Sequence, residues 1–304
     1  MNKKIVIMMS TYNGEKYIEK QLESIFGQKT DCDVNLYVRD DKSKDSTLDI
    51  LSSWEDKIDI KYIKDDNNLG AARSFWKLLK EVPEADYYAF SDQDDFWDAD
   101  KLQKAVKAIG DTKEEVLWCS NCRIINSEGN VMDEKKHKVK PNLFIPSQIV
   151  CGSMQGCAMV FNSSLRNRVL KINDKNILMH DIIIMLYALA EGKVLYEECP
   201  CFSYRVHENN VVAKEGKSFI ISVKSTIDRW FGKKNKYEVS NLAKKIIMDK
   251  EIRLSKEDRE YLYNVARCRK SLKSRIWIIN NKNTDSTNKK AVRSFKIRVL
   301  LGIV

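Results

Sequence analysis

Three clusters of polar residues stand directly after short apolar runs, and they carry the side chains with which this chain could do chemistry. They occupy residues 10–15, 39–47 and 91–95. The third cluster holds three carboxylates on one short turn, those of Asp92, Asp94 and Asp95. Carboxylates crowded in this way raise one another's pKa unless a cation lies among them. Hard divalent cations such as Mg²⁺ bind a few carboxylate oxygens and complete their shell with water and phosphate. The third cluster therefore predicts a metal site for a phosphate-bearing ligand.

Alternating strand and helix patterns position these clusters. Nearly continuous apolar runs predict strands at residues 4–9, 34–38, 58–63 and 87–90. Helical spacing predicts helices at residues 17–27, 46–54 and 71–79. Such strand–helix units in succession predict a parallel α/β sheet with right-handed crossovers. Ligands bind beyond the carboxyl ends of the strands in such sheets. One polar cluster alone is explained by a capped loop, but three at one edge predict a binding site.

The pattern continues beyond residue 100 with more irregular spacing. Helices are expected at residues 101–109 and 180–190, strands at residues 116–125 and 156–161, and a loop up to about residue 153. After residue 210 the chain becomes a series of basic amphipathic helices. We therefore place a boundary near Lys214, which gives a domain at residues 1–213 and a helical extension at residues 214–304.

The net charge of +10 divides unevenly between these two parts. The extension has 24 basic and 9 acidic residues, a net charge of +15, which leaves −5 for residues 1–213. A basic surface attracts nucleic acid or anionic lipid, whereas an acidic sheet edge repels phosphate unless a metal is bound. The two parts are thus expected to have different partners.

The polar clusters also resemble a known family. The motifs in order are Ser-Thr-Tyr-Asn-Gly-Glu (10–15), Arg-Asp-Asp-Lys-Ser-Lys-Asp-Ser-Thr (39–47), Asn-Asn-Leu-Gly (67–70) and Phe-Ser-Asp-Gln-Asp-Asp-Phe-Trp (90–97). Over about residues 4–212 this order resembles the inverting family 2 glycosyltransferases with the GT-A fold. It is most similar to the bacterial rhamnosyltransferases of cell-wall and capsular polysaccharide assembly. The resemblance implies a Rossmann-like, mostly parallel sheet flanked by helices.

The resemblance also implies the composition of the donor site. Asp94 would be the direct ligand of Mg²⁺ or Mn²⁺, and Asp92 would contact the ribose, the metal or its waters. Either Asp40 or Asp41 would accept a hydrogen bond from a pyrimidine ring. The residues expected to line or close over the nucleotide are Thr11, Tyr12, Glu15, Asn68, Gly70, Arg73 and Gln93.

A catalytic base is implied at Asp181, which follows His180 at the start of an expected helix. A carboxylate there stays ionised, as a base must, although an ordinary helix cap is the simpler alternative. By the same resemblance, Gly156 and Cys157 would lie beneath the acceptor. Arg205 would offset the charge of the diphosphate. His207 would complete the metal shell or contact the diphosphate, or else be a surface residue.

The expected donor is dTDP-β-L-rhamnose, with a UDP-hexose as the alternative, and the acceptor is a saccharide or lipid-linked saccharide. We expect a cytoplasmic, peripheral membrane protein, because no signal-peptide pattern or membrane-length apolar run is present. The apolar stripes expected to contact anionic lipid, or instead to pack internally, are Ile220-Val223-Ile227-Trp230-Phe231 and Val292-Phe295-Val299-Ile303. Residues 238–273 are expected to pack on the domain or in a homodimer.

Two other classes of protein remain open. A sugar nucleotidyltransferase shares this fold class, but it normally has a Gly-rich basic loop where this chain has residues 10–15. A nucleic-acid-binding protein could use the basic extension, which has no recognised nucleic-acid-binding motif. We therefore expect no nucleic-acid partner. The eight cysteines are expected to be reduced thiols, because Cys119 and Cys122 have the spacing of a zinc knuckle but lie in an expected strand and have no clear second pair.

Overall fold

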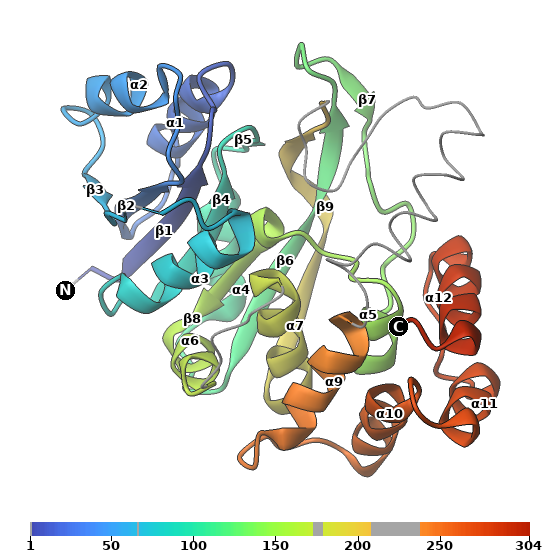
Figure 1. Cartoon of the computed structure of the whole chain (residues 1–304). Coiled ribbons are helices and arrows are strands. Elements are labelled where there is room, and N and C mark those ends of the chain that lie inside the picture. The colour runs from blue at the N-terminus through green and yellow to red at the C-terminus, as the bar shows by residue number, and fades with distance from the viewer. Residues whose placement is uncertain (1, 66, 173–178, 208–237) are drawn as a thin grey trace. The chain divides into compact units, whose positions relative to one another are not determined.

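A computed structural model of the chain describes residues 2–65, 67–172, 179–207 and 238–304. These residues form two compact units, each described separately below (Figure 1). The first unit is Met1–Lys138, Met154–Ala188 and Gly192–Val206, and the second is Val139–Ser153, Leu189–Glu191 and His207–Val304. The predicted boundary near Lys214 and the predicted stripe at residues 220–231 lie outside the described residues.

A nine-stranded sheet is the centre of the first unit. Its strands are β1 (Lys4–Thr11), β2 (Asp33–Asp40), β3 (Ile60–Tyr62), β4 (Tyr87–Asp92), β5 (Phe96–Trp97), β6 (Val116–Ile125), β7 (Val131–Asp133), β8 (Met159–Asn162) and β9 (Lys193–Arg205). They are ordered β3-β2-β1-β4-β8-β6-β9-β5, and β7 pairs with β6. Strands β3, β2, β1 and β4 are parallel, as are β6 and β9. The predicted mostly parallel α/β sheet is confirmed.

Strand β8 is the main interruption of this parallel order. It pairs antiparallel with β4 on one side and with β6 on the other. The sequence predicts one strand at residues 156–161, but the structure begins this segment with a 3₁₀ turn, η1 (Gly156–Ala158), and only then enters β8. The turn places Gly156 and Cys157 beside the end of β4, where the acidic cluster begins.

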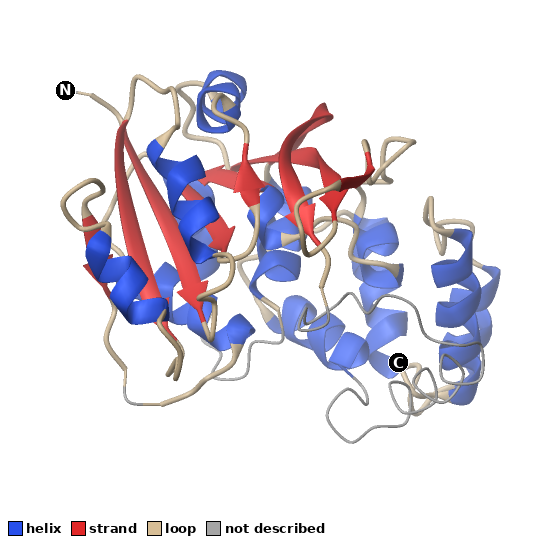
Figure 2. Cartoon of the chain, turned by 90° about the horizontal axis from the view of Figure 1, so that it is seen from above, coloured by secondary structure: helices blue, strands red, loops and turns tan. Residues whose placement is uncertain are grey.

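Helices lie alongside the parallel strands (Figure 2). Those of the first unit are α1 (Ile18–Phe26), α2 (Thr47–Ser53), α3 (Ala71–Glu81), α4 (Lys101–Ile109), α6 (Ser163–Leu170) and α7 (His180–Glu191) up to Ala188. Helix α3 packs on β1 and β2, and α4 packs on β6, β8 and β9. All side chains from Ile5 to Met9 are buried, which explains why β1 is apolar without alternation.

The second unit is helical in its described part. Its helices are α5 (Ile145–Val150), α9 (Glu238–Met248), α10 (Lys256–Arg267), α11 (Leu272–Asn280) and α12 (Lys289–Leu301). Consecutive helices from α9 to α12 pack on one another, and α5 packs on α10 and α12. The sequence predicts only a loop up to residue 153. The structure instead has helix α5 there, packed on α10 and α12. Among the described residues, no helix combines the length and the hydropathy that crossing a bilayer requires.

Candidate active site

The carboxyl ends of β1, β2 and β4 form one edge of the sheet. Thr11 of β1 is aligned with Asp40 of β2, and Ser10 is aligned with Asp92 of β4. The three polar clusters follow directly after these positions. The predicted convergence of the clusters at one edge is confirmed, and its cause is the parallel register of the three strands.

Hydrogen bonds join the loop after β1 to the loop after β2. Thr11 Oγ1 donates to Asp40 Oδ1 at 2.8 Å, and the backbone N–H of Gly14 donates to Thr47 Oγ1 at 2.8 Å. The backbone N–H of Ser46 donates to Glu15 Oε2 at 3.0 Å. Thr11 and Glu15, both predicted to line the nucleotide pocket, therefore also hold the two loops together.

Gln93 connects the acidic turn to the loop after β1. Its Oε1 accepts from the backbone N–H of Tyr12 at 2.8 Å, and its Nε2 donates to the carbonyl of Tyr12 at 3.0 Å. A side chain at Gly14 would collide with the Gln93 amide and so would displace Gln93 from these two hydrogen bonds. The Tyr12 side chain remains 48% exposed, so its ring is free to contact a ligand.

Asp41 organises the turn between β3 and α3. Burial opposes its ionisation, but Arg39 and the N–H groups of Leu69 and Gly70 together hold the pKa of Asp41 below its ordinary value. Its Oδ1 accepts from Arg39 Nη1 at 2.6 Å and from Leu69 N at 2.7 Å, and its Oδ2 accepts from Gly70 N at 2.7 Å. The side chain of Asn68 donates to the Asp41 carbonyl at 2.7 Å.

These bonds distinguish the two carboxylates that follow β2. Both carboxylates accept from protein donors, Asp40 from Thr11 and Ser43, but Asp41 is buried whereas Asp40 is only partly buried. Asp40 is therefore the more accessible of the pair for a ligand. Arg73, in the first turn of α3, is exposed.

The acidic turn after β4 contains a buried group of potential metal ligands. Among the described residues, Asp92, Asp95 and Cys157 have ligand atoms within 4.8 Å of one another. Asp95 is fully buried, its Oδ1 accepts from Arg205 N at 3.3 Å, and its Oδ2 has no hydrogen-bond partner in the described part of the chain. Asp94 and His207 do not belong to this group.

The electrostatics of the turn suit a cation. Desolvation and the neighbouring Asp94 carboxylate raise the pKa of Asp92 to about 7, and the same causes raise the pKa of Asp95. Burial raises the pKa of the Cys157 thiol. A divalent cation would reverse these shifts by favouring the ionised carboxylates. The partnerless Asp95 oxygen and the predominance of carboxylate donors thus fit Mg²⁺ or Mn²⁺.

Two buried cationic side chains hold the backbone near these carboxylates: Lys101 binds turn η1, and Arg205 binds the acidic turn. Lys101 Nζ donates to the carbonyl of Cys157 at 2.6 Å and lies 3.5 Å from the centre of the Trp97 ring. Burial lowers the pKa of Lys101 to about 8. Arg205 Nε donates to the carbonyl of Asp94 at 2.9 Å, so this arginine, expected at the diphosphate, also positions the acidic turn.

Sequence reasoning missed Lys101. Its signal was a lysine at the first position of an expected helix, where the helix dipole disfavours a positive charge. A cation there is explained by the carboxylates that it faces, since the charges of Asp95 and Asp92 both oppose the fall in the pKa of Lys101.

His180 and Asp181 occupy the first turn of α7. The His180 ring is buried, with its centre 4.3 Å from that of Phe75 and 4.5 Å from that of Phe90. Burial lowers the pKa of His180, and neither ring nitrogen has a partner among the described residues. The imidazole is therefore neutral at pH 7. Asp181 is partly exposed, and its charge contributes to the raised pKa of Asp92, so the two carboxylates are electrostatic neighbours.

The remaining predicted residues lie at different depths. Gly156, Cys157 and His180 are all buried, and Gly156 lies against the His180 ring. His207 is partly exposed and directly precedes residues 208–237, which lie outside the described residues.

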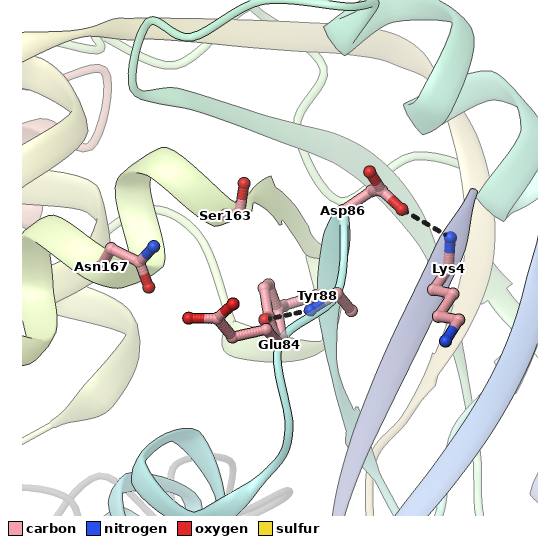
Figure 3. Close-up of a pocket in the computed structure, with 7 residues that line it drawn as sticks. Lys4, Glu84, Asp86, Tyr88, Ser163 and Asn167 are labelled. Carbon is pink, nitrogen blue, oxygen red and sulfur yellow. Dashed lines mark hydrogen bonds between the residues drawn. The ribbon is translucent and has the colours of Figure 1, made fainter. Parts of the chain in front are cut away.

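A separate pocket of about 330 Å³ lies at the opposite edge of the sheet, at the amino ends of β1 and β4 (Figure 3). Asp86 there accepts from the backbone N–H of Lys4 at 2.8 Å, and the Tyr88 hydroxyl accepts from Ala85 N at 2.7 Å. The residues that line it are Lys4, Glu84, Ala85, Asp86, Tyr88, Ser163 and Asn167. None of them belongs to the polar clusters.

Sequence comparisons relate the chain to enzymes that transfer sugars. The family model named glycosyl transferase family 2 matches residues 6–169. A dTDP-rhamnosyl transferase, RfbG of Shigella flexneri, is 31% identical over 263 residues, which cover 79% of this chain and 85% of the relative. The putative teichuronic acid biosynthesis glycosyltransferase TuaG of Bacillus subtilis is 25% identical over 219 residues, covering 70% of this chain and 83% of the relative.

Solved structures show the same fold. The structure of residues 1–349 of S. aureus TarS in complex with UDP-GlcNAc gives a TM-score of 0.62 at 17% identity, covering 99% of this chain and 82% of that chain. The mannosyltransferase PcManGT from Pyrobaculum calidifontis, in complex with GDP-Man and Mn²⁺, gives a TM-score of 0.55 at 16% identity, covering all of this chain and 86% of that chain.

Proposed function

The chain belongs to glycosyl transferase family 2, and from this premise we propose that it moves a sugar from a nucleotide-sugar donor to a hydroxyl group of a saccharide acceptor with inversion. Family membership favours this class over a sugar nucleotidyltransferase or a nucleic-acid-binding protein. The observation that carries the proposal is the sheet edge at which the acidic turn, the joined loops of β1 and β2, and the Asp181 carboxylate come together.

The proposed reaction is a single displacement. Asp181 accepts the proton of the acceptor hydroxyl while the hydroxyl oxygen forms a bond to the anomeric carbon. The bond from that carbon to the diphosphate oxygen breaks, and the nucleoside diphosphate leaves with the electron pair. The position of Asp181 in the first turn of α7 supports its role, because the positive end of the helix dipole attracts a carboxylate there.

Asp94, as the family motif implies, and Asp92, whose ligand atom lies within 4.8 Å of those of Asp95 and Cys157, would hold the divalent cation, which when bound would neutralise charge on the leaving diphosphate. The complex of PcManGT with Mn²⁺ supports a metal in this fold. Arg205 holds the backbone of the acidic turn through the carbonyl of Asp94, and Lys101 holds the neighbouring turn η1 through the carbonyl of Cys157. Their rigid support would limit the reorganisation of the turn during transfer.

The proposed donor is dTDP-β-L-rhamnose, and the proposed product is part of a cell-surface polysaccharide. Support comes from the likeness to a dTDP-rhamnosyl transferase over most of both chains, and to a putative teichuronic acid biosynthesis glycosyltransferase. A UDP-hexose is the alternative donor. The acceptor would be a saccharide or a lipid-linked saccharide.

A donor panel tests this proposal. The purified chain is incubated with dTDP-rhamnose, UDP-glucose, UDP-galactose and UDP-GlcNAc, each with Mg²⁺, with Mn²⁺ and with a chelator, and release of nucleoside diphosphate is measured. We expect release from dTDP-rhamnose that the chelator abolishes. Preferential release of nucleoside diphosphate from a UDP-sugar would overturn the assignment of dTDP-rhamnose as the donor but not the proposed class of reaction. Release that persists with the chelator would overturn the proposed requirement for a divalent cation.

A further inference from the structure

Helices α11 and α12 and their flanks form a strongly basic part of the second unit. Residues 269–304 contain ten basic residues and one acidic residue, Asp285. Asp285 is already paired, because Lys289 Nζ approaches its two oxygens at 2.6 and 2.8 Å. An anionic partner would therefore find almost no opposing charge on this part of the chain.

The apolar stripe of α12 predicted to contact lipid is buried in the structure. Phe295 and Val299 are fully buried, and Val292 and Ile303 nearly so. Helix α12 packs on α11 and α5, and this stripe is the face that does so. Of the two alternatives for this stripe, contact with lipid or internal packing, the structure confirms internal packing, since these four side chains are part of the core of the second unit.

A different set of apolar side chains is exposed on the same two helices. Ile297, Leu300 and Leu301 of α12 are spaced i, i+3 and i+4, which places them on one face, and Leu272 and Ile276 of α11 are spaced i and i+4. All five side chains are between 47% and 64% exposed. We call these five residues the α11–α12 patch.

A hydrogen bond brings the two halves of the patch near each other. Arg275 Nη1, from the residue next to Ile276, donates to the carbonyl of Leu300 at 3.1 Å. Close basic residues on both helices are also exposed, including Lys273 beside Leu272 and Arg293 one turn before Ile297. Apolar side chains with a basic rim thus adjoin on one surface.

We propose that the α11–α12 patch binds the surface of a membrane that contains anionic lipids. The leucine and isoleucine side chains would enter the boundary between headgroups and acyl chains, and the rim of lysines and arginines would contact lipid phosphates. Their long aliphatic stems let these cations reach the headgroups while the apolar residues are inserted.

Charge and composition favour this partner over two others. A symmetric dimer through the patch would bring the same basic surface of two copies together, and like charges would oppose it. Single-stranded nucleic acid is usually held by exposed aromatic rings between basic residues, whereas the exposed side chains here are aliphatic. Lipid satisfies both the apolar and the basic groups.

Vesicle sedimentation with the full chain tests the proposal without using its activity. We expect binding to phosphatidylcholine vesicles that contain phosphatidylglycerol, weaker binding to phosphatidylcholine alone, and loss of binding at high salt. The double variant Ile297→Ser/Leu300→Ser should lower the partition coefficient roughly tenfold or more, since two apolar side chains no longer enter the interface. Lys273→Gln/Arg293→Gln should lower it for the anionic vesicles only.

Matched variants far from the patch serve as controls. Leu48→Ser/Met132→Ser removes two comparably exposed apolar side chains from the first unit, and Lys107→Gln/Lys113→Gln removes two exposed charges there. Both should bind vesicles as the wild type does, and circular dichroism checks that every variant is folded. Equal binding by patch and control variants would overturn the proposal. So would a concentration-dependent dimer, or binding to single-stranded DNA, that the patch variants alone abolish in the absence of vesicle binding.

Discussion

Replacing Gly156 by alanine should reduce turnover through His180, although neither residue reacts. A methyl group at Gly156 would lie 2.5 Å from Nε2 of His180, well inside van der Waals contact. The imidazole cannot easily retreat, because the rings of Phe75 and Phe90 lie 4.3 and 4.5 Å from it. The first turn of α7 must therefore shift, and Asp181 is the next residue of that turn.

The size of the effect follows from packing and positioning. Adding one methyl group to a filled core costs about 1–3 kcal/mol of unfolding free energy. A displacement of about 1 Å at a catalytic group can cost roughly 100-fold in rate. We expect Gly156→Ala to lose between about 10- and 100-fold in kcat. The KM for the donor should change little, because the described contacts of the loops after β1 and β2 do not include His180.

A double-mutant cycle with His180→Ala is the appropriate assay. Removing the imidazole makes room for the added methyl group, so Gly156→Ala should cost less in the His180→Ala background, with a coupling energy of about 1 kcal/mol or more. Chemical denaturation and initial rates of nucleoside diphosphate release are measured for all four proteins. Additive effects in both measurements, or a Gly156→Ala protein with wild-type kcat and stability, would refute this reasoning.

Three further predictions concern the base, the metal and pH. Asp181→Asn should bind the donor with nearly unchanged affinity in calorimetry but lose about 100-fold or more in transfer, and near-wild-type turnover would exclude it as the base. Asp94→Ala should bind nucleoside diphosphate equally with and without Mn²⁺, whereas the wild type should bind it more tightly with the metal; a persisting metal effect would contradict the assignment of Asp94 as the ligand. Burial lowers the pKa of His180 in the folded chain, so as the pH falls the imidazole of the unfolded chain is protonated first. The contribution of the neutral imidazole to the free energy of unfolding is therefore fully present above about pH 6.5 and is lost as the pH falls below it. Denaturation at pH 7.5 and 5.5 should therefore show a smaller loss for His180→Leu than for the wild type, and an equal loss would contradict the buried neutral imidazole.

Much of the first unit could be predicted because its periodicity is strong. The predicted bounds of α4 and β6 agree with the structure at both ends. Strands buried on both faces are nearly continuous apolar runs, and the polar residues after them must meet where parallel strands end. The motifs at those ends were also specific enough to indicate the family that the comparisons confirm.

The partners of each polar side chain were not predictable in the same way. Asp40 and Asp41 are equivalent by sequence, but only Asp41 accepts hydrogen bonds from the backbone N–H groups of Leu69 and Gly70. Lys101 reaches Cys157, which is 56 residues away along the chain. Such pairings depend on which loops pack together, and local propensity carries no information about them.

Sequence alone determined the α/β class, the family and the sheet edge that carries the carboxylates, because all three follow from local periodicity and from motifs in order. Only the tertiary structure decided which face of α12 is core. Both faces contain apolar residues at helical spacing, and burial against α11 and α5 selects Phe295 and Val299 while Ile297 and Leu300 stay exposed. The tertiary structure likewise decided that His180 is a neutral, buried neighbour of Asp181, because its surroundings come from α3, β4 and η1. A periodic pattern shows that a helix has an apolar face, but the packing partners determine which side chains are removed from water.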